Sequence, residues 1–305
     1  MHSRELHVVT GAFGFTGKYI THRLLAMGKK VRTLTGHPNR PNPFGSRVEV
    51  LPFQFDRPGE LVKNLQGATT LYNTYWIRFA RGPATFAGAV ENSRALIKAA
   101  AEAGVKRMVH ISITNPSVDS PLPYFRGKAL VEKAVVDSGL SYAIIRPAVI
   151  FGPEDILINN IAWLLKRFPV FGVPGAGDYR LQPVFVEDLA ELAVDAGQRK
   201  ENMICDAPGP EKFTFLELVQ VIRDKIGSRA RIIHVNPGSA YFLCKLLGRL
   251  VNDVLLTRDE IRGLMANLLV TGSPPAGQTS LADWLEQNRN TVGVKYASEL
   301  NRHYR

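Results

Sequence analysis

Apolar positions in the first half of the chain alternate between short continuous runs and helical spacing. The run from Leu6 to Val9 predicts a buried strand, whereas Ile20, Leu24 and Met27 recur at helical intervals and predict a helix. The alternation continues, with strands predicted at residues 31–35, 48–55, 70–75, 105–113 and 142–145 and helices before Gly67, at 89–103 and at 124–138. This order predicts a parallel sheet with right-handed crossovers.

After Arg146 the regular alternation ends. An apolar helix and a loop rich in Gly and Pro come first, a strand leading into a helix is predicted over 181–194, and most of the remainder is predicted to be helical. We therefore predict an α/β fold, a Rossmann-type doubly wound parallel sheet with a smaller, mostly helical C-terminal cap. The first domain is predicted at residues 1–152 with a return segment at 181–207, and the cap at 153–180 and 208–305.

A glycine-rich turn links the first predicted strand to the first predicted helix. Gly11, Gly14 and Gly17 have the spacing G-x-x-G-x-x-G. A tight turn, a close approach of backbone to a pyrophosphate and close packing of helix on strand would each exclude a Cβ atom. N–H groups at the start of a helix attract phosphate. Because a strand precedes the glycines and a helix follows them, we predict a dinucleotide site.

The residues after the second predicted strand bear on which dinucleotide fits. An NAD site usually places Asp or Glu there to bind the ribose 2′-hydroxyl, whereas an NADP site offers a cation. This chain has Thr35, His37 and Arg40 in that segment and no acid, with Lys18 and Arg32 adding positive charge nearby. We therefore predict that NADP(H) is favoured over NAD(H).

The third predicted strand is followed by an acidic residue, Asp56, directly after Phe55. A carboxylate at this strand end can accept a hydrogen bond from the amino group of adenine. Asp is also a preferred N-cap residue, and a short helix is predicted to follow. The two roles are equally compatible with the sequence.

Tyr124 and Lys128 stand four residues apart on one predicted helix, so their side chains share a face. A phenol with a pKa of about 10 is a poor acid at neutral pH, and a neighbouring ammonium lowers that pKa by favouring the phenolate. The pair therefore indicates a general acid with a lysine that tunes it and can also bind a ribose. A surface aromatic beside a lysine is the alternative, because such neighbours arise freely on helices.

Composition is that of an ordinary globular protein of 305 residues, with 45% hydrophobic and 21% charged residues. The net charge of +11 would suit nucleic acid, but the chain has no long basic run and no zinc-finger spacing. We interpret the charge as a basic surface around a polyanionic cofactor and predict no nucleic-acid partner. The isolated Cys205 and Cys244, and the lack of an H-E-x-x-H pattern, predict neither a disulfide framework nor a metal site.

No apolar run reaches the roughly 18 residues of a membrane span, and strand-like residues begin by Leu6, before a signal peptide would fit. We predict a cytoplasmic protein. The most apolar helical run, Ala240 to Leu256, is interrupted by Lys245, Arg249 and Asp253. We interpret it as a cap helix over the pocket, with a helix lying on a membrane surface as the alternative.

Aromatic residues follow the fourth and sixth predicted strands, where the walls of a substrate pocket would lie. They are Tyr75, Trp76, Phe79, Phe151, Trp163, Phe168 and Phe171. Most aromatic side chains in such positions pack in a core. If several line the pocket, the substrate is an apolar small molecule.

Four segments together resemble the extended and atypical short-chain dehydrogenases/reductases: TGAFGFTG at 10–17, YFRGK at 124–128, RPAVIFG at 146–152 and VEDLA at 186–190. Within that superfamily the chain is similar to the NAD(P)H-binding branch that includes NmrA-like proteins and relatives of the nucleotide-binding accessory subunit of complex I. The similarity extends over nearly the whole chain. It implies a Rossmann fold with a bound nicotinamide dinucleotide.

The resemblance also implies roles for individual residues. It implies that the three glycines border the pyrophosphate, that Tyr124 and Lys128 face the nicotinamide ribose and the reacting oxygen, and that Asn92 helps to position the lysine. The predicted cofactor-binding residues are Thr10, Gly11, Phe13, Gly14, Phe15, Thr16, Gly17, Thr35, His37, Arg40, Phe55, Asp56, Asn73, Thr74, Lys128 and Pro147.

One position departs from the family pattern. Members with a full triad usually end the fifth strand with a serine that steadies the substrate carbonyl, and Ile113 occupies that position here, between Ser112 and Thr114. Neighbours of an inward residue point away unless the strand has ended. The candidate catalytic residues are therefore Tyr124, Lys128, Ser112, Thr114 and Asn92.

Three functions are compatible with these features. The first is an NADPH-dependent oxidoreductase that acts on a carbonyl or similar group, with Tyr124 as general acid. The second, close behind, is an NADP(H)-binding redox sensor or an assembly or accessory protein without turnover, which Ile113 favours. The third is an epimerase or dehydratase that keeps its cofactor, supported only by similarity of fold.

Overall fold

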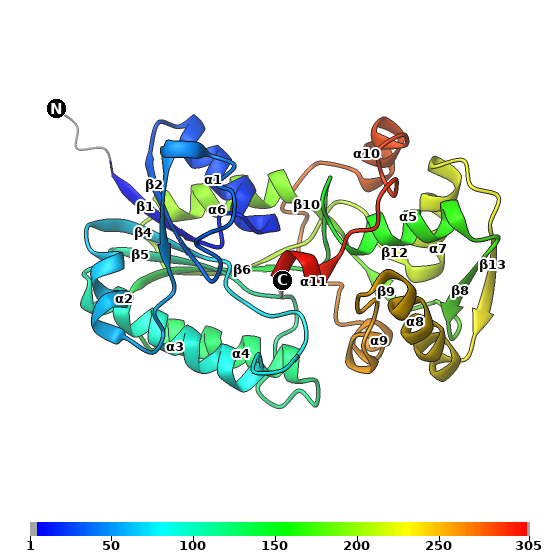
Figure 1. Cartoon of the computed structure of the whole chain (residues 1–305), viewed down its shortest axis with the longest axis horizontal. Helices are drawn as coiled ribbons and strands as arrows, with labels where there is room; N and C mark the ends of the chain where they lie inside the picture. Colours follow the sequence, from blue (N-terminus) through cyan, green and yellow to red (C-terminus); the bar gives the residue numbers. More distant parts are fainter. Residues whose placement is uncertain (1–4, 304–305) are drawn as a thin grey trace. The chain divides into compact units, whose positions relative to one another are not determined.

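The computed structural model describes residues 5–303, which divide into two compact units (Figure 1). Unit 1 holds the chain up to Pro147 and the segment Leu189–Asp206. Unit 2 holds Ala148–Asp188 and the chain from Ala207 onward. The return to unit 1 thus begins at Leu189, whereas the sequence placed the start of the return segment at residue 181.

A seven-stranded sheet organises unit 1 and has the strand order β11-β6-β5-β4-β1-β2-β3. Its strands are β1 Leu6–Thr10, β2 Lys30–Thr35, β3 Val48–Pro52, β4 Ala68–Asn73, β5 Arg107–Ile111, β6 Ser141–Pro147 and β11 Met203–Ala207. All neighbours among β1 to β6 pair in parallel. The order of these six strands is that of a Rossmann sheet, which confirms the predicted fold class.

Helices cover both faces of this sheet. They are α1 Phe15–Ala26, α2 Pro58–Leu65, α3 Phe86–Glu102, α4 Pro123–Val136 and α6 Val186–Gln198, and a short 3-10 helix, Gly45–Arg47, precedes β3. Figure 1 shows α1 and α6 on one face and α2, α3 and α4 on the other. On the second face Leu61, Leu96 and Val131 of the helices pack with Val8 and Leu71 of the sheet. The helical spacing of the apolar positions therefore identified the faces that become buried.

A buried arginine holds the end of the returning helix α6. The guanidinium of Arg107, 4% exposed at the start of β5, donates to the carbonyls of Ala196 at 2.7 Å and Glu201 at 2.9 Å. A cation at a helix C-terminus satisfies unpaired carbonyls and complements the negative pole of the helix. Arg107 thereby ties the return segment to the middle of the sheet.

Unit 2 combines helices with three two-stranded pairs. The helices are α5 Leu157–Arg167, α7 Phe215–Lys225, α8 Pro237–Val251, α9 Arg258–Met265, α10 Leu281–Asn288 and α11 Glu299–His303. The pairs are β7 Ile150–Phe151 with β10 Val184–Phe185, β9 Arg180–Leu181 with β12 Phe213–Thr214, and β8 Val170–Pro174 with β13 Arg231–Val235. Phe151, Ile158, Leu218 and Trp284 lie in its core.

The pair of β8 with β13 was not predicted, because β8 lies in the segment interpreted as a loop rich in Gly and Pro. A Cβ atom at Gly172 would lie 3.2 Å from the side chain of Val235, so the glycine allows the two strands to pack closely. Tertiary pairing outweighs weak local strand propensity here.

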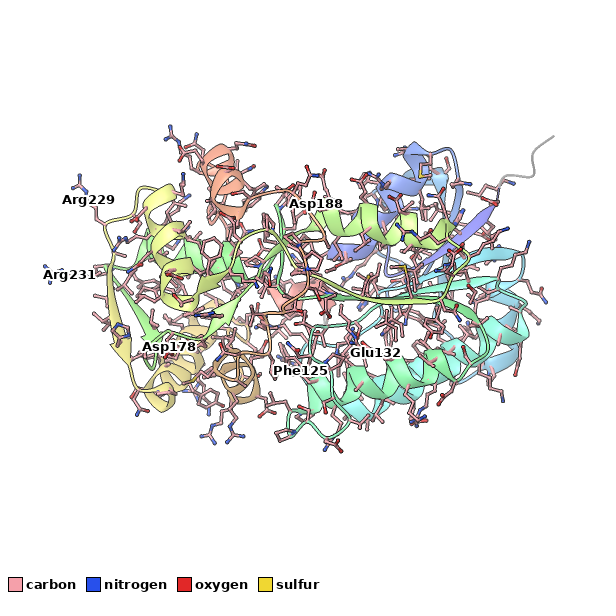
Figure 2. All side chains as sticks on the ribbon, turned by 180° about the vertical axis from the view of Figure 1, so that it is seen from behind. Phe125, Glu132, Asp178, Asp188, Arg229 and Arg231 are labelled. Atoms are coloured by element: carbon pink, nitrogen blue, oxygen red, sulfur yellow. The ribbon has the colours of Figure 1, made fainter. Side chains whose placement is uncertain are left out.

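The segment VEDLA forms the start of α6, and its Asp188 has a structural role in unit 2. The carboxylate of Asp188, labelled in Figure 2, accepts hydrogen bonds from the backbone N–H of Thr279 at 2.9 Å and from the hydroxyl of Thr279 at 3.0 Å. A Cβ atom at Gly277 would collide with the same carboxylate. Asp188 thus fixes the loop that precedes α10.

Among residues 5–303, no helix is long and apolar enough to cross a membrane, and no group of His, Cys, Asp and Glu is placed to hold a metal ion.

Candidate functional site

The glycine turn after β1 is closed by contacts that leave no room for larger residues. Gly11 has a φ of +66°, and its N–H donates to the carbonyl of Leu34 on β2 at 2.8 Å. Its own carbonyl accepts from Gly14 at 2.8 Å. A Cβ atom at Gly17 would lie 2.8 Å from the Gly11 carbonyl carbon and closer still to its oxygen. The first turn of α1 therefore rests directly on the strand end.

The N-terminus of α1 carries no side-chain cap. Its N-cap residue is Gly14, and no acidic residue lies in the first turn. By contrast, α7 and α9 begin with complete capping boxes at Thr214 and Thr257. The positive pole of α1 is thus left without an acid of its own, in the arrangement that binds a phosphate after a glycine turn.

A single hydroxyl joins the glycine turn to the end of β4. The Oγ1 atom of Thr10 accepts from the backbone N–H groups of Thr74 at 2.8 Å and Tyr75 at 3.0 Å and donates to Oδ1 of Asn73 at 3.1 Å. The hydroxyl of Thr74 donates in return to the carbonyl of Thr10 at 2.6 Å. The ends of β1 and β4 are therefore locked together where the sequence predicts the cofactor.

The chain of polar contacts continues to β5. Nδ2 of Asn73 lies 3.1 Å from Nδ1 of His110, and both side chains are completely buried. Burial lowers the pKa of His110 well below its usual value, so the imidazole is neutral and accepts from the amide at Nδ1. Because both ends of the Asn73 amide are occupied, this side chain joins three strand ends.

The predicted ribose segment follows β2 and is shaped by its own backbone. The hydroxyl of Thr35 accepts from the N–H of His37 at 3.1 Å, and the carbonyl of His37 accepts from the N–H of Arg40 at 3.2 Å. His37 and Arg40 are half-buried, and Thr35 is buried. These two hydrogen bonds make the backbone turn directly after β2, in the segment that carries Arg40, the predicted phosphate-binding cation.

Phe13, a residue of the glycine turn, holds the far end of that segment. Its ring stacks on Phe44 at 6.5 Å between centroids, and Phe44 is 3% exposed. His22 of α1 contacts the edge of Phe44 at 4.8 Å. The bulky residue at this position of the turn thus anchors the loop after β2, a role that the sequence did not reveal.

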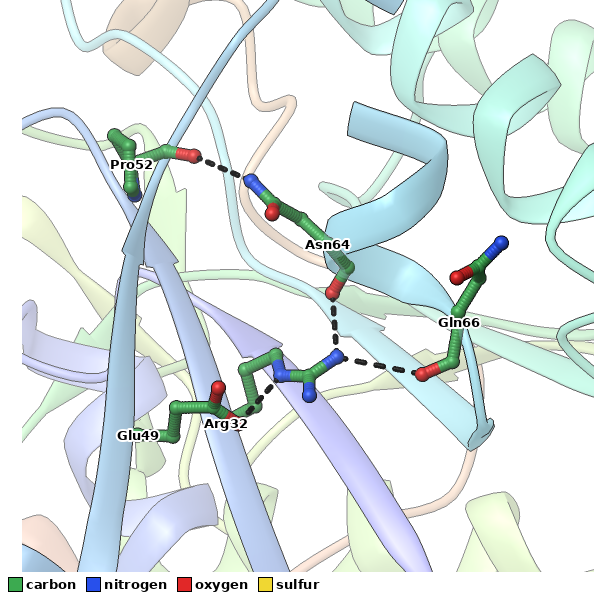
Figure 3. A network of polar contacts seen from close by, with 5 residues as sticks. All are labelled: Arg32, Glu49, Pro52, Asn64 and Gln66. Carbon is green, nitrogen blue, oxygen red and sulfur yellow. Dashed lines mark hydrogen bonds and ion pairs between the residues drawn. The ribbon is translucent and has the colours of Figure 1, made fainter. Parts of the chain in front are cut away.

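Arg32 does not add charge to the cofactor segment, in contrast to the sequence-based expectation. Figure 3 shows its Nε donating to Glu49 at 2.8 Å and its Nη1 donating to the carbonyls of Asn64 at 2.8 Å and Gln66 at 3.3 Å. Its guanidinium caps the C-terminus of α2 instead. The expectation failed because alternate residues of β2 face opposite sides of the sheet.

The predicted adenine side lies at the end of β3. Asp56 is exposed, and its carboxylate is 3.9 Å from Arg57. The N-cap of α2 is Arg57 rather than Asp56, so the capping alternative is wrong. Phe55 stacks on Phe53 at 4.7 Å and meets Tyr75 at 5.1 Å, which forms an aromatic cluster beside this strand end.

Lys128 is the most unusual charged group of unit 1. Its side chain is only 3% exposed, and Nζ donates to the carbonyl of Ile111 at the end of β5 at 2.8 Å. Burial lowers the pKa of its ammonium to about 7, while the nearby carboxylate of Glu132 opposes that shift. Lys128 thus changes its charge within the physiological range of pH.

Trp76, on the loop after β4, covers this lysine. The Nζ atom of Lys128 lies 5.0 Å from the centre of the indole, and Tyr124 meets the same ring edge-on at 6.0 Å. A Cβ atom at Gly127 would lie 2.8 Å from the indole, so the glycine within YFRGK makes room for it. From the sequence, Trp76 was predicted only to line a pocket. The glycine at position 127, next to Lys128, is the sequence signal that a large side chain such as Trp76 packs there.

Glu132 lies one turn beyond Lys128 on α4 and is paired with Arg146 of β6. Figure 2 shows Glu132 on the side of α4 that faces the sheet. The Nε of Arg146 donates to Oε1 at 3.0 Å, and Nη2 donates to Oε2 at 2.5 Å. A bidentate pair of this kind fixes the rotation of α4, and with it the face that carries Tyr124.

The remaining predicted catalytic residues lie near these strand ends with different partners. The amide of Asn92 donates to the hydroxyl of Tyr75 at 2.9 Å, whereas Nζ of Lys128 donates to the carbonyl of Ile111. Ser112 and Thr114 are buried, as is Ile113 between them. The hydroxyl of Ser112 has no hydrogen-bond partner among residues 5–303, and the N–H of Thr114 donates to the carbonyl of Pro147 at 3.0 Å.

Comparison with known proteins agrees with this geometry. Residues 11–156 match the family described as NAD(P)H-binding. NADH dehydrogenase [ubiquinone] 1 alpha subcomplex subunit 9 of Arabidopsis thaliana, a mitochondrial protein, is 27% identical over 283 residues, which cover 86% of this chain and 70% of that protein.

Two solved structures share the fold. An NADPH-dependent quinone oxidoreductase of Escherichia coli, complexed with NADPH, has a TM-score of 0.75 at 21% identity and covers 93% of this chain and all of that one (100%). A triphenylmethane reductase of Citrobacter, complexed with NADP(H), has a TM-score of 0.74 at 20% identity and covers 92% of this chain and 99% of that one.

Replacing Gly17 with alanine tests the turn. The added Cβ meets backbone atoms of Gly11, so we expect a loss of about 1–3 kcal/mol in the free energy of unfolding and at least about a tenfold loss of NADPH affinity. Gly59→Ala, where no atom lies within 4 Å of the new Cβ, is the matched control and should leave both values near wild type. Equal affinities of the two variants would contradict the assignment.

Lys128→Met tests the buried ammonium. The pKa of Lys128 is about 7 in the folded protein and about 10.4 in an unfolded chain, so the unfolded chain binds more protons between these values. The free energy of unfolding of the wild type should therefore rise relative to Lys128→Met as the pH increases from about 7 to about 10. Urea unfolding at several pH values measures this difference. Lys98→Met, at an exposed position, should follow the wild type, and parallel curves for all three proteins would refute the prediction.

Proposed function

We propose that this chain, whose residues 11–156 match the NAD(P)H-binding family, binds NADP(H) and uses it to reduce a carbonyl or similar group of an apolar small molecule. The observation that carries the proposal is the pair of Tyr124 and Lys128. The lysine is fixed to the carboxyl end of β5, and the glycine turn follows the carboxyl end of β1 in the same parallel sheet.

Three parts of unit 1 support the proposed cofactor site. The uncapped first turn of α1 would bind the pyrophosphate, and the close packing at Gly17 leaves that approach open. Arg40, after β2, would pair with a 2′-phosphate, since no acid stands in that segment to bind a 2′-hydroxyl. Lys128 would bind the nicotinamide ribose. The charge of Arg40 supports the proposed preference for NADP(H).

NADPH held in this way would supply a hydride, and the protein would supply the proton. Tyr124 donates from its hydroxyl to the oxygen that becomes negative as the carbonyl is reduced. Lys128 favours that step when it is protonated, because a nearby positive charge stabilises the phenolate left behind. Since the pKa of Lys128 is about 7 in the free protein, we expect turnover to depend on pH in this range.

The substrate is proposed to be apolar because the side chains around Tyr124 are aromatic. Trp76 and Phe86 meet its ring edge-on at 6.0 and 6.1 Å, and Phe125 lies at 5.7 Å. A flat conjugated carbonyl compound, such as a quinone, would pack well against these rings. The E. coli protein of the same fold is a quinone oxidoreductase, which makes quinones the first compounds to test.

A second candidate is an NADP(H)-binding accessory protein without turnover. Ile113 stands where catalytic members carry a serine, and its side chain is buried. The relative from Arabidopsis is a subunit of NADH dehydrogenase, so a role within a larger assembly is consistent with the same cofactor site. In that case the nucleotide would stabilise the protein rather than react.

Arg40→Ala tests the proposed choice of nucleotide. Loss of this cation should weaken NADPH binding about tenfold, as expected for a charged hydrogen bond to phosphate, and leave NADH binding unchanged. Arg47→Ala, at an exposed position of the same loop, is the control and should change neither affinity. A similar loss for both nucleotides in Arg40→Ala would mean that the residue does not face a 2′-phosphate.

Tyr124→Phe separates the two candidates. With a panel of quinones and other carbonyl compounds, followed by nicotinamide absorbance, the variant should lose about 10²- to 10⁴-fold in kcat while keeping its NADPH affinity. Tyr142→Phe on β6 is the matched control and should retain full activity. An unchanged rate in Tyr124→Phe would end the proposed mechanism, and tight NADPH binding with no turnover by the wild type would favour the accessory role.

A further inference from the structure

Helix α8 in unit 2 exposes most of its large apolar side chains to solvent. Phe242 is 66% exposed, Leu243 46%, Leu246 49% and Leu250 76%. The interpretation of this helix as a cap predicts the opposite, because a cap helix buries its apolar residues. Isolated exposed apolar residues are common on proteins, but four on one short helix form a patch that marks an interaction surface.

These four residues form one stripe along the helix. Phe242, Leu246 and Leu250 follow each other at intervals of four, and Leu243 lies beside them on the same side. The opposite side of α8 holds Ala240 and Gly248, which are buried, and packs against β8 and α9. The helix is therefore anchored in unit 2 by one face and presents the apolar stripe on the other. We call Phe242, Leu243, Leu246 and Leu250 the α8 stripe.

Positive charges border the α8 stripe. Lys245 and Arg249 are exposed and lie along one edge of it, each three residues after a member of the stripe. Over residues 227–252 the chain carries Arg229, Arg231, Lys245 and Arg249 and no Asp or Glu. Figure 2 shows Arg229 and Arg231 projecting outward from the segment that leads into α8.

Two acids next to α8 are engaged in other contacts. Asp253, just beyond the helix, is buried and accepts from the N–H groups of Glu299 at 2.8 Å and Leu300 at 3.2 Å. Glu260 closes the capping box of α9 through Thr257. Within α8 itself, the apolar face is therefore bordered by cations and by no acid.

We propose that the α8 stripe docks onto an anionic phospholipid surface, with α8 lying in the plane of the interface. An amphipathic helix with Phe and Leu on one face and Lys and Arg beside it inserts its apolar side chains among the acyl chains and places its cations at the phosphates. At 15 residues, α8 is about 22 Å long, which suits a helix that lies on a bilayer and is too short to cross it.

The test is flotation of the full chain with vesicles of phosphatidylcholine alone and with phosphatidylglycerol added. The wild type should bind the anionic vesicles and bind the neutral ones weakly. Lys245→Gln combined with Arg249→Gln should weaken binding to the anionic vesicles by about fivefold for each cation removed. Wild-type binding that is absent, or equal on the two kinds of vesicle, would overturn the proposal.

Leu246→Glu combined with Leu250→Glu tests the stripe itself and should reduce binding to anionic vesicles at least about tenfold. Val118→Glu combined with Val136→Glu, at positions that are 47% and 41% exposed, adds the same charge elsewhere and should bind as the wild type does. Circular dichroism and an unchanged Tm establish that the stripe variant is folded.

Light scattering of the same proteins without lipid tests whether a second copy of the chain, rather than lipid, covers the α8 stripe. A dimer of the wild type that Leu246→Glu with Leu250→Glu converts to a monomer would assign the stripe to a second copy of the chain and overturn the proposal. The expected result is a monomer in both cases, with lipid binding reduced in the stripe variant.

Discussion

The contact between the end of β1 and the first turn of α1 is the constraint on which unit 1 depends. A Cβ atom at Gly17 would collide with the carbonyl of Gly11, and one at Gly14 would lie 3.1 Å from the oxygen of that carbonyl, so glycine at these positions permits the helix to begin there. The hydroxyl of Thr10 then binds two N–H groups after β4, and Asn73 extends the contact to His110 on β5. Three strand ends and one helix start are thereby held in a single arrangement, which is the preorganisation that a dinucleotide site requires.

Burial lowers the pKa values of two basic side chains at the carboxyl ends of these strands. His110 is neutral, and the ammonium of Lys128 has lost most of its preference for the charged state. The sequence argument assumed a permanent charge on Lys128, whereas burial brings its pKa to about 7. In the proposed mechanism a polyanionic cofactor beside Lys128 would favour the protonated form, which would couple cofactor binding to the activation of Tyr124 through the charge of one lysine.

Local patterns predicted the elements of unit 1 and the glycine turn, because each depends on spacing within a few residues. The sequence did not predict contacts between distant segments. The contact of Phe13 with Phe44 has no signal in the sequence. Arg32 was expected to add charge near the cofactor, but it binds a carbonyl of α2 instead. Trp76 over Lys128 depends on Gly127, whose missing side chain has meaning only once α4 and the loop after β4 are placed. In unit 2, β8 escaped prediction because its pairing with β13 outweighs the glycine and proline within it.

The central claim is that unit 1 is a site for NADP(H), with the glycine turn at the pyrophosphate and Arg40 at the 2′-phosphate. Isothermal titration of the purified wild-type chain with NADPH and then with NADH tests it most directly. We predict saturable binding of one nucleotide per chain, tighter for NADPH than for NADH. No measurable binding of either nucleotide would contradict the claim.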